Sequence, residues 1–74
     1  MTAQEMFKEA GYPKITKEYM GDELRAITYT EVIHSRFITF YTGNQQLIEI
    51  SGKAIRPKEL KVINQQIKEL GWIE

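Results

Sequence analysis

Apolar residues recur at helical spacing near both ends of the chain, with polar positions between them. Such a stripe every three or four positions is typical of a helix that buries one face. We therefore expect two helices, one near each end, whose buried stripes are Ala3, Met6, Phe7 and Ala10 in the first and Leu60, Ile63, Ile67 and Leu70 in the second.

Both expected helices end in the same way. Residues 7–12 (Phe-Lys-Glu-Ala-Gly-Tyr) echo residues 67–72 (Ile-Lys-Glu-Leu-Gly-Trp). A glycine just past the last turn adopts the left-handed conformation that closes a helix, and the residue after it packs back onto the last turn. We expect Tyr12 to contact Phe7 and Trp72 to contact Ile67 in this manner.

The residues at the two expected helix starts differ in how well they cap a helix. Thr2 and Glu5 match the capping box, in which each side chain bonds the other residue's backbone amide. Pro57 suits the first position of the final helix, and Glu59 suits the positive end of its dipole. Arg56 stands at the expected N-cap of that helix and is a poor capping residue.

Between the helices, β-branched and aromatic residues alternate with polar ones in three segments, which we predict to be strands: 24–32, 36–42 and 47–51. The joining segments around 33–35 and 43–45 are short, which favours antiparallel hairpins and hence a three-stranded meander. Residues 14–22 are expected to form a connector in which Ile15 and Met20 dip into the core.

Alternation along these strands separates an apolar inner face from a mostly polar outer face. The inner set is Ile27, Tyr29, Ile38, Phe40, Ile48 and Ile50. We expect a single α+β domain over residues 1–74, in the order α-β-β-β-α, with both helices packed on the inner face. Replacing Leu60 or Ile67 with alanine should then cost about 2–5 kcal/mol.

The amino-acid composition of the chain argues against several classes of function. The chain has 10 Lys plus Arg and 10 Asp plus Glu, so it lacks the basic excess that is usual in DNA-binding domains. It has no cysteine, which excludes disulfides and thiolate zinc sites. The polar, acidic start does not resemble a signal peptide, and no apolar run is long enough to span a bilayer. We expect a cytoplasmic protein without a cofactor, metal or small-molecule ligand.

Three segments carry a resemblance: the opening Met6-Phe-Lys-Glu-Ala-Gly-Tyr12, the pair Glu59-Leu60 and residues 66–73 (Gln-Ile-Lys-Glu-Leu-Gly-Trp-Ile). The chain resembles small uncharacterised proteins of prophages and mobile elements in Gram-positive bacteria. The resemblance implies a small intracellular α+β protein and supplies no functional residue.

The leading functional hypothesis is a non-enzymatic module that binds a protein partner or a second copy of itself. Phe37, Tyr41 and Leu47 fall on the outer sheet face by alternation, and apolar residues on a surface often mark a partner site. Two alternatives stay open at this point. The connector 14–22 could cover these residues, or the register could be shifted by one, which would turn them inward.

The second hypothesis is a nucleic-acid accessory protein that uses a basic stripe on the final helix, formed by Arg56, Lys58, Lys61 and Lys68. No residue set favours an enzyme. His34 stands alone in an expected turn, where it is typical of a solvated residue. The carboxylate pairs lie on expected helix or connector surfaces, whereas acid–base chemistry needs carboxylates that converge on a pocket.

Overall fold

The structure is a computed structural model that describes residues 1–43, 46–52 and 54–72. Along the chain, one helix precedes the strands and the other follows them. The elements are α1 (Ala3–Glu9), β1 (Lys14–Met20), β2 (Glu23–Thr30), β3 (Phe37–Tyr41), β4 (Leu47–Ile50) and α2 (Pro57–Leu70). Every strand pairs antiparallel with the next one, in the spatial order β1-β2-β3-β4.

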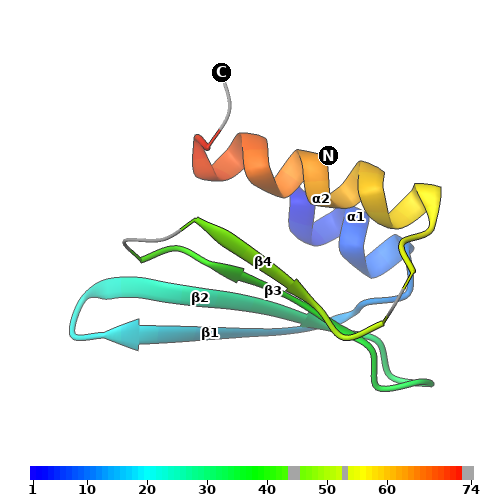
Figure 1. Cartoon of the computed structure of the whole chain (residues 1–74), viewed down its shortest axis with the longest axis horizontal. Coiled ribbons are helices and arrows are strands. Elements are labelled where there is room, and N and C mark those ends of the chain that lie inside the picture. The colour runs from blue at the N-terminus through cyan, green and yellow to red at the C-terminus, as the bar shows by residue number, and fades with distance from the viewer. Residues whose placement is uncertain (44–45, 53, 73–74) are drawn as a thin grey trace.

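Both helices lie side by side on one face of this meander, so the chain folds as two layers (Figure 1). The predicted α+β class and the placement of the helices are confirmed. The predicted number of strands is wrong, because the sheet has four strands and the order is α-β-β-β-β-α.

The additional strand is β1, which occupies the segment predicted to be a connector. It lies at the edge of the sheet, and only Ile15 among its residues is half-buried, whereas Met20 is exposed rather than in the core. An edge strand with charges on both faces shows no apolar alternation, so its pattern does not reveal it. The Gly21-Asp22 turn joins it to β2, and Gly21 has the positive φ (+63°) that a two-residue hairpin requires.

The core lies between the inner sheet face and the helices. Phe7 of α1 stacks on Tyr29 with 3.8 Å between ring centroids, and both rings meet the edge of Phe40. Ile27 and Ile38 complete the buried part of the sheet, and Ile48 and Ile50 are half-buried beside it. The predicted inner face is therefore confirmed.

The glycine endings of both helices are also confirmed. The Tyr12 amide donates to the Phe7 carbonyl (2.8 Å), and the Trp72 amide donates to the Ile67 carbonyl (3.1 Å). Each ending is the double hydrogen bond of a Schellman motif. At the start of α1, the Thr2 and Glu5 bonds form the predicted capping box.

The predicted buried stripe of α2 is confirmed for Ile63, which is buried, and for Ile67 and Leu70, which are half-buried against the core. It is wrong for Leu60, because the buried face is rotated at the start of the helix. The helix buries Glu59, Val62, Ile63 and Gln66, whereas Leu60 is 51% exposed. Glu59 and Gln66 are two turns apart on one face, where they accept hydrogen bonds from the hydroxyls of two core tyrosines, Tyr12 and Tyr29. The core is therefore partly polar on the α2 side. Neither helix in the described ranges is long and apolar enough to cross a membrane.

Candidate protein-interaction surface

The outer sheet face is built of three rows of residues that run across all four strands. The pairings between strands place Glu18, Ala26, Tyr41 and Leu47 in one row and Thr16, Thr28, Thr39 and Glu49 in the next. The third row is Lys14, Thr30, Phe37 and Ser51. Because both helices lie on the opposite face, the described part of the chain places no helical layer over these rows (Figure 1).

The three residues predicted as the binding surface all lie on this face. Tyr41 and Leu47 are direct cross-strand partners, and both are exposed. Phe37 is half-buried and lies at the other end of β3, with the buried Thr39 between it and Tyr41. The structure therefore brings two of them together and places the third two rows away.

The alternatives to an uncovered surface do not hold. The segment 14–22 pairs beside β2 as a strand and turn, so it widens the face instead of covering it. The register places Phe37, Tyr41 and Leu47 opposite outer-face residues, so they do not point into the core.

The Tyr41 hydroxyl donates to Glu49 Oε1 (2.7 Å), which raises the pKa of Tyr41 and fixes the orientation of its ring on the surface. A fixed aromatic side chain loses little conformational freedom on binding, which favours a contact residue.

The β2–β3 loop contributes two strongly exposed apolar side chains, which sequence reasoning missed. Ile33 is 84% exposed and Val32 is 69% exposed. The loop extends beyond the sheet on the side away from the helices, next to the start of β3 (Figure 1). The sequence feature that could have revealed them is an apolar pair next to a turn. The strand predicted over residues 24–32 included Val32, so the pair was not recognised.

Several contacts hold this loop in one shape. The Glu31 amide donates to the Arg36 carbonyl (2.7 Å), and His34 Nδ1 lies 2.8 Å from Glu31 Oε1. Ser35 adopts a left-handed φ of +55°, which costs a residue other than glycine about 1–2 kcal/mol. A conformation of this kind persists only where the surroundings impose it. The loop therefore presents Ile33 in a preset arrangement.

The anchor of the loop is a buried polar cluster around Glu59, whose side chain is 1% exposed. Glu59 accepts hydrogen bonds from the Tyr12 hydroxyl, from Arg36 Nη2 (3.2 Å) and from the Arg56 amide (2.8 Å). Arg36 also donates to the Ala54 carbonyl (3.0 Å). The cluster thus ties the end of α1, the β2–β3 loop and the start of α2 together.

Electrostatics favour the ionised form of Glu59. Burial opposes ionisation, but the Arg56 amide, the Tyr12 hydroxyl and the charges of Arg36 and Arg56 outweigh it, so the pKa of Glu59 lies below its usual value. Burial and the bond to Glu59 raise the pKa of Tyr12 to about 12. These groups are paired with one another inside the fold, so the cluster is structural.

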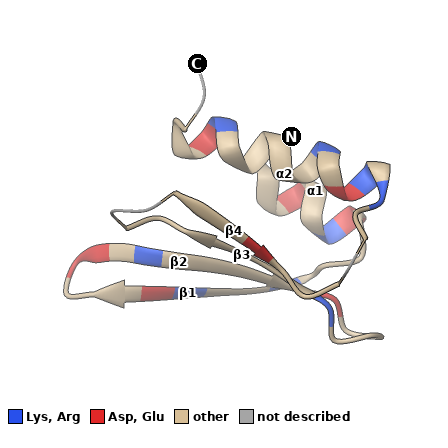
Figure 2. Ribbon diagram, in the orientation of Figure 1, with Lys and Arg blue, Asp and Glu red and all other residues tan. Residues whose placement is uncertain are grey.

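The three lysines of the predicted basic stripe lie on exposed positions of α2. Arg56 precedes the helix and makes no side-chain capping bond. Lys58 and Lys61 line a shallow depression of about 270 Å³ against α1, where Glu9 opposes their charge. Lys68 lies roughly 15 Å along the axis from Lys58 and roughly 10 Å from Lys61, at about 1.5 Å per residue. Figure 2 shows basic and acidic segments alternating along both helices, so these cations form no continuous basic field.

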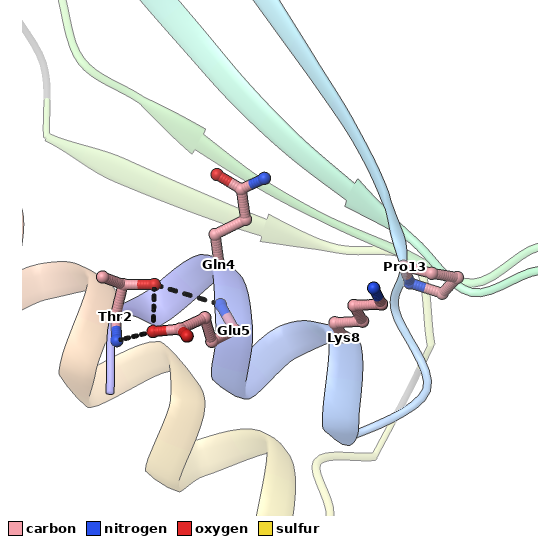
Figure 3. Close-up of a pocket in the computed structure, with 5 residues that line it drawn as sticks. All are labelled: Thr2, Gln4, Glu5, Lys8 and Pro13. Atoms are coloured by element: carbon pink, nitrogen blue, oxygen red, sulfur yellow. Dashed lines mark hydrogen bonds between the residues drawn. The ribbon is translucent and has the colours of Figure 1, made fainter.

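A second depression, of about 350 Å³, lies beside α1 and is lined by polar groups. Figure 3 shows Gln4 and Lys8 extending from the helix, with Lys8 directed towards Pro13, while Thr2 and Glu5 face each other. The latter two are occupied by the capping box, which leaves little for a ligand. Among the described residues, no three His, Asp or Glu side chains gather closely enough to hold a metal ion.

Comparisons with protein-family models, with curated proteins and with solved structures gave no match for this chain.

Proposed function

We propose that this protein is a non-enzymatic interaction module that binds a protein partner through its outer sheet face and the adjoining β2–β3 loop. The observation that carries the proposal is the uncovered Tyr41–Leu47 pair at one end of the face, with Ile33 and Val32 at the other. Between them, the middle row carries threonines and one carboxylate, that of Glu49. Aromatic and aliphatic anchors around such a surface are typical of protein interfaces.

The competing use of the α2 cations for nucleic acid has less support. Salt-dependent phosphate binding needs several cations that act together. Here Lys58 and Lys61 share their depression with Glu9, and Lys68 lies near the other end of the helix.

The test compares two surfaces of similar exposure on opposite sides of the molecule. Tyr41→Thr with Leu47→Thr removes the anchors but keeps residues that favour strands. Leu60→Thr is the matched control, because Leu60 is 51% exposed and Leu47 is 53% exposed. Both variants and the wild type are used as bait in quantitative affinity capture from the native host.

We expect a specific partner to be retained by the wild type and by Leu60→Thr and to be lost with the outer-face variant. Far-UV circular dichroism and urea denaturation establish that the variants remain folded. A partner that is captured equally by all three baits would refute the outer face as the binding surface. Loss with Leu60→Thr alone would move the site to the helices.

A further inference from the structure

The free edge of β1 is the second feature of the molecule that suits a partner. Within the described residues, β1 pairs with β2 on one side only, and its residues other than Ile15 are exposed. An edge strand of this length presents a row of unpaired amide and carbonyl groups to another strand. The other edge, β4, is shorter, because it covers only Leu47–Ile50.

We propose that β1 pairs antiparallel with β1 of a second copy, around a two-fold axis through Thr16. A two-fold axis perpendicular to the sheet keeps both pairs of helices on one side and joins the two outer faces. Directly opposite residues then share a face. Lys14 and Glu18 both lie on the outer face, opposite Thr30 and Ala26 of β2. In the proposed register, Lys14 of each copy meets Glu18 of the other.

Charge selects this register from those that the symmetry allows. An axis through Lys17 places two lysines opposite each other, and an axis through Glu18 does the same with two glutamates. An axis through Ile15 draws Pro13, which has no amide hydrogen, into the ladder. Only the axis through Thr16 gives two opposite-charge pairs and no like-charge pair.

The regular part of the β1–β2 pairing has the same extent as the proposed ladder. The register is continuous from Lys14 to Glu18 and then shifts, because Arg25 is an extra residue of β2 at that point. A bulge of this kind bends β2 and disrupts the ladder locally. The proposed ladder uses this regular part, in which Ile15 lies opposite Lys17 on the helix side. Since the contact is a short strand with few flanking side chains, the dimer is expected to be weak and to dissociate on dilution.

Single cysteines test the geometry, because the chain has none of its own. Thr16→Cys places two thiols directly opposite each other, at a Cα separation that a disulfide spans. Lys17→Cys reports the competing register. Ser51→Cys, exposed on the outer face directly after β4 at the other edge of the sheet, reports random collision. Under mild oxidation we expect Thr16→Cys to cross-link about tenfold faster than either control, because only its thiols are held within bonding distance.

Charge reversal tests the same contact without a covalent bond. Lys14→Glu turns both attractive pairs into repulsive ones and should raise the dimer dissociation constant about tenfold. Adding Glu18→Lys to this variant restores opposite charges across the axis and should recover the wild-type constant. Sedimentation equilibrium measures the constants, and circular dichroism checks the fold of each variant.

The proposal fails if Thr16→Cys cross-links no faster than Ser51→Cys, if Lys17→Cys is the fastest, or if the charge swap does not restore association. Self-pairing would also be refuted if the protein stayed monomeric at millimolar concentration. The same holds if the β1 variants, used as bait in the capture experiment, failed to retain a different protein that the wild type retains. The Tyr41→Thr, Leu47→Thr variant leaves β1 intact and should dimerise like the wild type. Failure of the edge proposal is therefore distinguishable from failure of the outer-face proposal.

Discussion

Glu59 offers the sharpest test of how this small fold holds together. The change to alanine removes the acceptor of three hydrogen bonds: from the Tyr12 hydroxyl, the Arg36 guanidinium and the Arg56 amide. It also leaves Arg36, whose side chain is only 19% exposed, without its carboxylate. Since these contacts join three separate parts of the chain, their loss should lower global stability and not only fray α2.

The size of the expected loss in the free energy of unfolding follows from the burial of the Glu59–Arg36 ion pair. Removing one partner of a buried ion pair costs about 3–5 kcal/mol. Arg36 keeps its bond to the Ala54 carbonyl, so we expect the lower part of this range, about 3–4 kcal/mol. Glu59→Gln preserves the shape and one acceptor oxygen but loses the charge, for an expected cost of about 1–2 kcal/mol. A small domain with a total stability of about 5–15 kcal/mol remains measurable after either change.

Urea denaturation followed by far-UV circular dichroism gives these free energies. The matched control is Lys58→Ala, one residue away on the exposed side of the same turn, which should stay within about 0.5 kcal/mol of the wild type. A cycle that combines Tyr12→Phe with Glu59→Gln isolates their shared hydrogen bond and should show a coupling energy of at least about 0.5 kcal/mol. An alanine variant as stable as the Lys58 control would refute the role assigned to the cluster.

Three further outcomes follow from the core. Leu60→Ala should cost less than about 1 kcal/mol, whereas Ile63→Ala should cost about 2–5 kcal/mol in the same denaturation assay; equal costs would contradict the observed rotation of α2. Glu59 has a lowered pKa, so its contribution is present above its usual value of 4.5 and is lost as the pH falls through the lower folded value. Urea titrations from neutral to acid pH should therefore show a shallower loss in Glu59→Gln than in the wild type. The pKa values of Tyr12 and Tyr29 are raised to about 12, so the free energy of unfolding should fall between pH 10 and 12. A titration followed by phenolate absorbance should show these two rings ionising at a higher pH than a free tyrosine. Titration of all four tyrosines near 10 would contradict their burial.

The parts of the fold that were predictable from sequence are those in which apolar residues alone carry the pattern. The alternation of Ile27 with Tyr29 and of Ile38 with Phe40 located two strands and their buried face. The glycine-aromatic endings located the ends of both helices. In each of these cases the residue that marks the element is also the residue that stabilises it, so pattern and packing agree.

The rotation of α2 was not predictable in this way, because two of its buried positions are polar. Glu59 and Gln66 read as surface residues, yet each satisfies a tyrosine hydroxyl that would otherwise be buried without a partner. Tyr12 and Tyr29 are the only hint in the sequence, since buried tyrosines need acceptors. Leu60 had the stronger apolar signal and lies 51% exposed instead.

The position of the proposed outer-face surface was predictable to the same degree as the sheet. Alternation placed Phe37, Tyr41 and Leu47 on the outer face, and the register agrees. It did not find the exposed pair Val32 and Ile33, because apolar residues at the end of a strand pattern are read as its continuation.

The strand β1 has the largest consequence for the two proposed interactions. As a connector, residues 14–22 would have crossed the sheet and could have covered Tyr41 and Leu47. As a strand, this segment extends the outer face by a row of polar residues and ends it in a free edge. The charges that hid the strand from pattern analysis, on Lys14 and Glu18, are the same charges that make its edge complementary to itself. Lys14→Glu and its rescue by Glu18→Lys therefore test whether these charges select a second copy or only keep the edge apart from other chains.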